Sequence, residues 1–233
     1  ETTTGAVRLE DKKAGIVGAP TAKVSDLLKG QYRAPFIALM VFYALINLSA
    51  NTLGQYGTYL LVNEAHVDVA AAAGMGLPFL IVGVLGTFWF MAIADGRRRF
   101  TYFTVGAVLT VLGNLVPVFF GFNVPVYFIS NFIALGGATF AGEALMKMWT
   151  QESFPTLLRT TAQGSVIFVA RFAAALLAGV TPAIIAMGVP VLYGILSALC
   201  AIGVITAWVV FRKRVGVSEF ASEPASESAT VAV

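Results

Sequence analysis

The chain alternates between long apolar stretches and short polar segments, and six of the apolar stretches are long enough to cross a bilayer. A spanning helix needs about 20 apolar residues, whereas a membrane β-strand shows about 10 residues of alternating polarity, which these stretches lack. Backbone polar groups in lipid must bond within their own segment, so the pattern predicts helices. The expected helices cover residues 36–62, 70–94, 102–120, 124–149, 160–187 and 189–211.

The two ends of the chain do not share this pattern. Residues 1–30 are polar with mixed charge and contain no signal-peptide core, so we expect a cytoplasmic linker. Residues 215–233 are rich in Ser, Ala and Glu and are expected to form a disordered cytoplasmic tail. Residues 31–214 are expected to form one bundle of six transmembrane helices. Because the chain starts with Glu1, we expect it to be a piece of a longer protein.

The composition of the 233 residues excludes several classes of protein. Hydrophobic residues make up 58% of the chain and the mean hydropathy is +0.83. Charged residues make up only 12%, about half the share of soluble domains, which is too few to cover a water-exposed surface. A soluble enzyme domain, a nucleic-acid-binding protein and a disordered chain are therefore excluded. One cysteine excludes a disulfide scaffold, and one histidine, His66, cannot form a metal cluster alone.

The basic residues, which give a net charge of +3, fall on one side of the membrane if the helices alternate in direction. All but Arg171 lie before the first helix or close to the loops after the second, fourth and sixth helices, and the other three loops contain none. This distribution follows the positive-inside rule. It predicts a multi-pass protein of the cell (plasma) membrane with both termini in the cytoplasm.

Prolines and glycines interrupt the apolar stretches. Pro78, Pro117 and Pro182 fall inside three of the predicted helices, and we expect them to kink these helices. Glycines recur in the second and fourth helices, where small residues let neighbouring helices approach closely. We expect most of these glycines to serve packing.

A row of polar side chains runs along the first predicted helix. Asn47, Asn51 and Gln55 are spaced four residues apart and so share one face, which Tyr59 continues. Uncharged amides and phenols suit a ligand with many hydroxyls, because they offer both donors and acceptors. The alternative is hydrogen bonding between helices, which is a common use of Asn and Gln in membranes. Polar residues at membrane depth tend to be functional, which favours a water-filled cavity.

Two charged residues lie at membrane depth. Glu143 is about 9 Å inside the end of the fourth predicted helix, at 1.5 Å per residue, and Arg171 is near the middle of the fifth. Each is costly in lipid and should face protein or water. They could pair with each other; otherwise Glu143 could accept a proton and Arg171 could hold a substrate oxygen. Asn131, in the fourth helix, is a further binding candidate or a partner for a neighbouring helix.

Two loops on the basic side carry charges of both signs. Asp95, Arg97 and Arg98 lie between the second and third helices, and Glu152 and Arg159 lie between the fourth and fifth. These charges could serve only to set the orientation of the helices in the membrane and to cover solvent-exposed faces. They could also form a latch of ion pairs between helix ends that must open during function, for which the two-pronged Arg–carboxylate pair is well suited.

These loops resemble signatures of the major facilitator superfamily, and of its sugar porters in particular. The run Glu152-x-x-Pro155-x-x-x-Arg159 resembles the segment that follows helix ten in the family. Asp95-Gly96-Arg97-Arg98 is similar to a shortened form of the D-R-x-G-R-R loop that follows helix eight.

The first predicted helix carries a third similarity to the sugar porters. Asn51, Gln55 and Tyr56 are similar to the N-x-x-x-Y-Y segment of helix seven, and all three motifs occur in the family's order. The resemblance covers residues 25–214. It implies an all-α membrane protein whose six helices form the C-terminal half-bundle of such a transporter, with the N-terminal six-helix half as partner.

The resemblance also implies a function and a set of site residues. The expected function is secondary active transport of a sugar or polyol, such as an inositol-like compound, by alternating access with the proton as coupling ion. Helix seven would supply hydroxyl-binding groups at Asn51, Gln55 and Tyr56. Glu152 and Arg159 would form an inner gate with the basic loop. No metal or other cofactor is expected.

Other functions fit the sequence less well. An organic-anion or carboxylate carrier of the same superfamily is the main alternative, with Arg171 binding the carboxylate. An intramembrane enzyme would need a nucleophile segment or an H-E-x-x-H motif, and the sequence has neither. A channel would need filter chemistry that is equally missing from the sequence. We therefore do not expect an enzyme.

Overall fold

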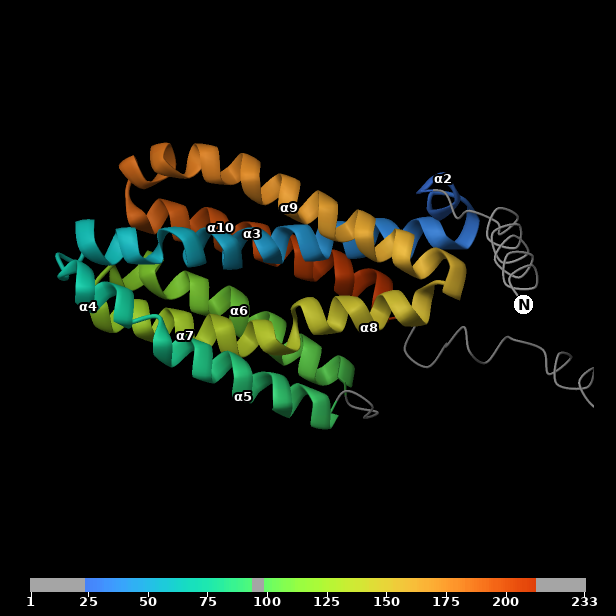
Figure 1. Ribbon diagram of the computed structural model, residues 1–233, viewed down its shortest axis with the longest axis horizontal. Helices are drawn as coiled ribbons and strands as arrows, with labels where there is room; N and C mark the ends of the chain where they lie inside the picture. Colours follow the sequence, from blue (N-terminus) through green and yellow to red (C-terminus); the bar gives the residue numbers. More distant parts are fainter. Residues whose placement is uncertain (1–23, 94–98, 213–233) are drawn as a thin grey trace, which may run out of the picture.

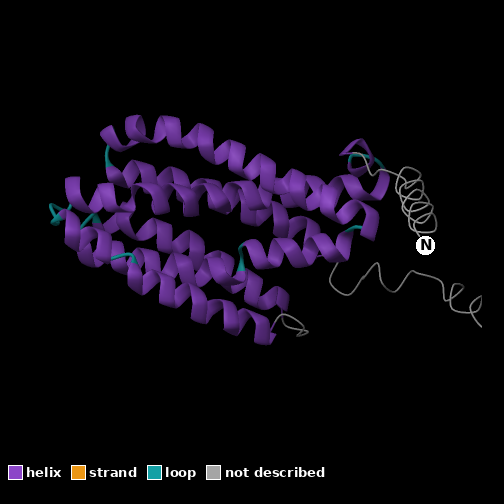
Figure 2. Ribbon diagram, in the orientation of Figure 1, coloured by secondary structure: helices purple, strands orange, loops and turns teal. Residues whose placement is uncertain are grey.

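The computed structural model describes residues 24–93 and 99–212, and within these ranges all regular structure is helical (Figure 2). Six helical segments there are long and apolar enough to cross a membrane, which confirms the predicted all-α class. The elements are α2 (Val24–Leu27), η1 (Gly30–Tyr32), α3 (Arg33–Asn63), α4 (Val69–Gly74), α5 (Leu77–Ile93), α6 (Arg99–Phe120), α7 (Val124–Phe140), α8 (Glu143–Ser153), α9 (Thr156–Ala186) and α10 (Val189–Phe211).

The long helices lie roughly parallel in a bundle with α9 on one flank and α5 on the other (Figure 1). Helix α3 packs against α9 and α10, α10 packs against α6, α6 packs against α7, and α7 packs against α5. Neighbours in the sequence are therefore often not neighbours in space. This order places α3, α10, α6 and α7 between the two flanks and leaves α5 and α9 largely uncovered.

The packing pattern repeats when the first three spanning segments are exchanged with the last three. Under this exchange the α3–α9 contact becomes the contact of α7 with α5, and the α3–α10 contact becomes α7–α6. The α6–α10 contact maps onto itself. Such a pair of three-helix repeats within one half is typical of transporters built from inverted repeats.

Two of the six predicted helices are broken, and our prediction of continuous helices was wrong there. The second segment is divided into α4 and α5, so Pro78 lies in the first turn of α5, where proline is tolerated, instead of kinking a helix. The fourth is divided at Ala141 and Gly142. A side chain at Gly142 would collide with the carbonyl oxygen of Ala138, so the break requires a glycine. Pro117 and Pro182 lie inside helices as predicted.

Short turns close the end of the bundle where α3, α6 and α9 finish. Asp68 accepts hydrogen bonds from the backbone of the first turn of α4, and Asn123 accepts one from the Val126 N–H at the start of α7. These side chains satisfy amides that the helices leave unpaired. Gly121 and Gly188 have positive φ angles of 73° and 119°, which allow the chain to reverse without steric strain.

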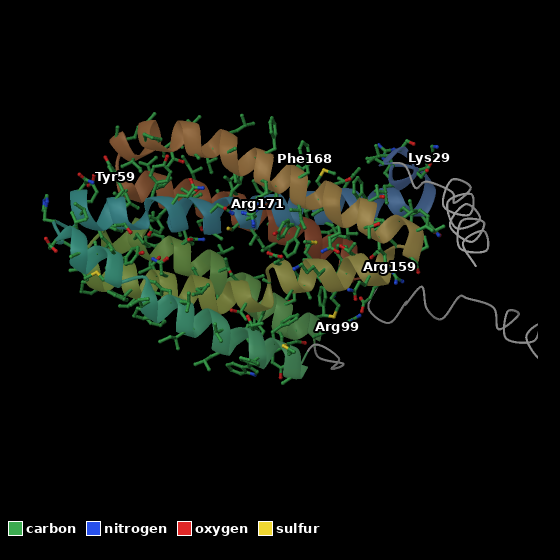
Figure 3. All side chains as sticks on the ribbon, in the orientation of Figure 1. Lys29, Tyr59, Arg99, Arg159, Phe168 and Arg171 are labelled. Carbon is green, nitrogen blue, oxygen red and sulfur yellow. The ribbon has the colours of Figure 1, made fainter. Side chains whose placement is uncertain are left out.

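Basic residues gather at the other end of the bundle, which we call the basic end. Lys29, Arg99 and Arg159 lie there, Tyr59 lies at the opposite end, and Arg171 lies between them (Figure 3). The last part of the predicted linker folds onto this end, because Leu27 of α2 is fully buried in the core. Residues 1–23 and 213–233 lie outside the described residues, so most of the linker and the predicted tail stay predictions.

Helices α6 and α7 make the closest contact in the bundle through small residues. A Cβ atom added at Gly113 would lie 2.5 Å from the backbone nitrogen of Ala134, and one added at Gly137 would lie 2.5 Å from the backbone nitrogen of Thr110. The hydroxyl of Ser130 donates to the Gly113 carbonyl across the same interface, at 2.8 Å. Close backbone approach of this kind is how membrane helices associate where burial from water gives no driving force.

Candidate functional site

The predicted polar row lies on α3 at the middle of the bundle, and two of its amides bond to each other. The Asn51 amide nitrogen donates to the side-chain oxygen of Asn47 at 2.6 Å and to its backbone carbonyl at 2.8 Å. Both side chains are half-buried, whereas Gln55 is exposed. The bonding holds the Asn51 side chain in one orientation, with its oxygen available to a further donor.

That donor is Arg171 of α9. Its Nη1 atom donates to the Asn51 side-chain oxygen at 3.0 Å. Arg171 lies 15 residues from either end of α9 and is exposed in this half-bundle, so its charge sits at mid-depth (Figure 3). One turn further along α3, the Tyr56 hydroxyl donates to the Ala178 carbonyl of α9 at 2.8 Å. The polar row therefore follows the line where α3 and α9 meet.

Glu143 begins α8 directly after the helix break. Its carboxylate accepts a hydrogen bond from the Tyr43 hydroxyl of α3 at 3.2 Å and pairs with Lys147, one turn along α8, at 2.7 Å. The pairing of Glu143 with Arg171 that we considered is therefore replaced by pairing with Lys147. Arg171 is still close enough to interact electrostatically with Glu143 and Tyr43.

Glu143 lies further from the end of its helix than the sequence indicated. Helix α8 continues to Ser153, so Glu143 lies about 15 Å from its end at 1.5 Å per residue. A carboxylate in the first turn of a helix is stabilised by the helix dipole, and here the dipole belongs to a half-helix that starts inside the membrane. The helix break, Lys147 and Tyr43 together stabilise the Glu143 carboxylate at a membrane depth where an unpaired charge would cost free energy.

The other predicted binding residues lie in two places. Tyr59 is half exposed on the face of α3 that carries Gln55, and its ring packs edge-on against that of Tyr56. Asn131 of α7 is half-buried and donates to the Tyr127 carbonyl at 2.9 Å. The structure thus brings Asn47, Asn51 and Arg171 together and sets Asn131 apart from them.

A cavity of about 300 Å³ lies between α3 and α7. Asn131 lines it, together with the hydroxyl-bearing side chains of Ser49, Thr58, Thr110 and Tyr127. None of these four was predicted from the sequence, because they come from three helices and share no spacing that a single segment would show. The nearest sequence signal is the run of small residues on α3 at Ala50, Gly54 and Gly57, which also line the cavity.

The predicted gate contains a bond that the sequence motifs did not indicate. Arg99, at the start of α6, pairs with Glu152 near the end of α8 through both guanidinium nitrogens, with Nη2 3.0 Å from Oε2. Arg159 donates from Nε to the Phe154 carbonyl at 2.8 Å. Asp95, Arg97 and Arg98 lie outside the described residues. Glu152 thus links the end of α8 to the start of α6 at the basic end. Its partner is Arg99, the residue directly after the Asp95–Arg98 motif.

Comparison with known proteins gives one informative match. The chain is 34% identical over 152 residues to the minor myo-inositol transporter IolF of Bacillus subtilis (strain 168), and this alignment covers 63% of the chain. The chain is a relative of an inositol transporter. This match confirms the resemblance to inositol-type porters of the major facilitator superfamily that the motifs indicated. No family model matches the chain, and no solved structure gives a significant match.

The match has two consequences for the site. Since the relative is a transporter, it supports the prediction that this chain is not an enzyme. The aligned part of the chain spans 33% of the relative's length. The six apolar helices of the described residues fit one half of such a transporter.

Proposed function

We propose that this chain is the C-terminal half of a secondary active transporter that moves a sugar or polyol across the cell membrane. The observation that carries the proposal is the 34% identity to a myo-inositol transporter. The half-bundle contributes neutral hydrogen-bonding groups, Asn51 and Gln55, which suit a ligand with many hydroxyls. Alternating access would follow from rocking of this bundle against the N-terminal six-helix half, with both termini in the cytoplasm.

The test is transport by the complete protein in proteoliposomes. We expect saturable uptake of labelled myo-inositol that is faster with an inward proton gradient than without one. Vesicles without protein give the background rate. Uptake that does not saturate for any polyol contradicts the proposed function, whereas saturable uptake that ignores the gradient contradicts the proton coupling alone.

Glu143 is the residue we propose to carry the coupled proton. Lys147 of α8 and Tyr43 of α3 both bond to its charged form, so protonation would weaken the pair within α8 and the contact between α3 and α8 at once. Replacing Glu143 by Gln keeps the size of the side chain and removes the exchangeable charge. We expect uptake by the Glu143→Gln protein to become independent of the pH gradient, while exchange of labelled for unlabelled substrate continues.

The control for this variant is Glu64→Gln, which removes an exposed carboxylate just beyond the other end of α3. It should leave the gradient dependence intact. If Glu143→Gln still responds to the gradient as the wild type does, Glu143 is a structural residue and the proton is carried elsewhere.

Asn51 and Gln55 are proposed to bind substrate hydroxyls. Replacing Asn51 by Ala removes an amide that could bond to a substrate hydroxyl, and a typical hydrogen bond between neutral groups contributes about 0.5–1.5 kcal/mol. We therefore expect the KM for myo-inositol to rise about three- to tenfold. Gln55→Ala should also raise the KM, and because Gln55 is exposed this protein should unfold at the wild-type temperature.

Asn63→Ala serves as the matched control for these two variants. Asn63 is exposed at the end of the same helix, and its amide donates to the Tyr59 carbonyl one turn earlier. Its replacement should not change the KM. Wild-type uptake by both Asn51→Ala and Gln55→Ala would assign the polar row to helix packing.

A second candidate function is transport of an organic anion. The observation that favours it is the charge balance at mid-depth: Lys147 neutralises Glu143, while Arg171 bonds to a neutral amide. A substrate carboxylate would balance Arg171. Uptake assays separate the two functions, because the first predicts uptake of labelled inositol that neutral polyols inhibit, whereas the second predicts uptake of a labelled carboxylate that other carboxylates inhibit.

A further inference from the structure

The cavity between α3 and α7 ends, on the side of the basic end, at a bond between two side chains. Helix α3 starts at the basic end and α7 runs towards it, so Ile46 and Ala138 are the lining residues of these helices that lie nearest to that end. Tyr43 lies three residues before Ile46, and Glu143 lies five residues after Ala138. The Tyr43 hydroxyl donates to Glu143 at 3.2 Å. This bond therefore closes the cavity towards the basic end.

The other end of the cavity reaches the surface of the bundle. Thr58 of α3 lines it there, together with Gly76, which lies in the break between α4 and α5. Both residues are exposed. The cavity thus leads from the surface near the end opposite the basic end to the bond between Tyr43 and Glu143.

The size and the lining of the cavity suit water. Its volume is about 300 Å³, and a water molecule in the liquid takes up about 30 Å³, so there is room for several molecules. A buried water needs polar partners, and the lining offers hydroxyls and an amide from Ser49, Thr58, Thr110, Tyr127 and Asn131. Asp, Glu, Lys and Arg do not occur among the described lining residues. A proton that entered the cavity would therefore meet no charged group before Glu143.

Two buried polar groups beside the lining also indicate water. Asn114 is fully buried; its amide nitrogen donates to the Ser49 hydroxyl at 3.1 Å, and its side-chain oxygen has no partner among the described residues. Tyr193 is fully buried as well, and its hydroxyl lies beside Asn131 without a well-formed hydrogen bond. Buried waters typically bond to polar groups that the protein leaves unpaired. Both unpaired groups lie next to residues that line this cavity.

The two carboxylate oxygens of Glu143 face different surroundings. Oε2 accepts the hydrogen bond from Tyr43, which is buried in the core. Oε1 pairs with Lys147, whose side chain is 45% exposed, and Arg171 of α9 is exposed and acts on Glu143 electrostatically. Helix α7, which precedes the break, carries no charged residue. A proton can therefore arrive at one oxygen from the interior of the bundle and leave from the other at the exposed face.

We propose that the α3–α7 cavity holds water that carries protons from the end opposite the basic end to Glu143, with the Tyr43 hydroxyl as the last relay. A hydronium ion in the cavity gives a proton to the Tyr43 oxygen while the Tyr43 O–H bond breaks and its proton passes to Oε2. The products are water and a neutral carboxylic acid, and Lys147 keeps its charge. Hydroxyls and water chains are known carriers of protons in proteins. This inference rests on the proposed function, in which Glu143 carries the coupled proton, and adds the route.

The test uses the complete protein in proteoliposomes that contain a pH-sensitive dye. Gly54 lines the cavity and an added Cβ atom there would meet nothing within 4 Å, so Gly54→Leu should displace water without disturbing a packed contact. We expect this variant to lose proton entry and gradient-driven uptake of labelled myo-inositol, while exchange of labelled for unlabelled inositol continues at the wild-type rate. Gly179→Leu is the matched control, because Gly179 is an exposed glycine of α9 that also has nothing within 4 Å and lies outside the cavity. It should behave as the wild type does.

A second variant, Tyr43→Phe, removes the relay hydroxyl and keeps the ring in the core. It should show the same loss of proton entry with exchange retained, and it decides the question if Gly54→Leu fails to fold. A purely structural role of the hydroxyl would lower thermal stability without separating exchange from proton entry. Tyr102→Phe is the control, because Tyr102 is partly exposed on α6 and its ring stacks on Phe140 away from the cavity lining.

The outcomes separate the route from the proposed function. If Glu143→Gln loses the gradient dependence while Gly54→Leu and Tyr43→Phe keep it, the route is overturned and protons reach Glu143 from its exposed face. A folded Gly54→Leu protein that no longer exchanges inositol also overturns the route, because the cavity then serves the substrate. If Glu143→Gln keeps the gradient dependence, the carrier and its route both fall although transport stands. A wild type without saturable uptake of any polyol overturns the proposed function as well.

Discussion

Replacing Gly137 by Ala should lower the free energy of unfolding by about 2–3 kcal/mol, whereas the same change at the adjacent Gly136 should leave it equal or slightly higher. A Cβ atom at Gly137 would lie 2.5 Å from the backbone nitrogen of Thr110 and 2.7 Å from its hydroxyl, and backbone cannot move aside as a long side chain can. At Gly136 a Cβ atom would meet nothing within 4 Å, and alanine is the better helix former.

The measurement is unfolding of the purified complete protein in one detergent, followed by temperature or denaturant. Because the two glycines are neighbours on α7, differences in expression, detergent binding or helix propensity act on both variants alike. Equal stability of the two proteins would show that α6 and α7 are not packed as closely as described.

Reversing the charge of Arg99 should reduce substrate uptake at least tenfold. Arg99 and Glu152 are each about one-quarter exposed (25% and 24%) and join the start of α6 to the end of α8 through two parallel contacts. Arg99→Glu places two carboxylates together, and like charges at close range repel. The basic end would then be biased towards an open arrangement, and a transporter that cannot close one end cannot complete its cycle. Proteoliposome uptake measures the effect.

The double variant Arg99→Glu with Glu152→Arg restores the pair and should recover most of the uptake. Lys29→Glu is the control, because Lys29 is a basic residue at the same end whose side chain is 71% exposed and pairs with Asp26 nearby in sequence. Exposed pairs contribute little, so its uptake should be unchanged. Failure of the double variant to recover activity would assign Arg99 a role other than pairing with Glu152.

The helices were predictable because their signal is local. Each apolar stretch carries enough hydropathy to be recognised alone, and residues 189–211 were predicted with the bounds that the structure shows. The break at Gly142 was not predictable in this way, since Ala141 and Gly142 lower the hydropathy of the fourth stretch only slightly. The backbone at the break admits only a glycine, because a side chain at position 142 would collide with the Ala138 carbonyl, and this is a property of the folded backbone.

The partners of the charged residues were harder to predict than their positions. Glu143 and Arg171 were located from the sequence, but Lys147 competes for Glu143 from one turn away, a spacing at which pairs form readily. Arg99 directly follows Arg97 and Arg98 of the matched motif. The sequence alone did not indicate which of these three arginines would pair with Glu152. Ser49 and Tyr127 line one cavity only because helices distant in sequence are adjacent in space.

The exchange symmetry of the bundle has a consequence for how such a chain can evolve. Corresponding helices carry their bases at opposite ends: Arg99 starts α6 and Arg212 follows α10, while Arg33 starts α3 and Lys147 lies late in the α7–α8 segment. A duplicated three-helix ancestor can keep its fold in both copies. The inverted copy, however, has to lose basic residues at one end of its helices and gain them at the other end. The two triplets are therefore free to stay alike in shape while their sequences must diverge.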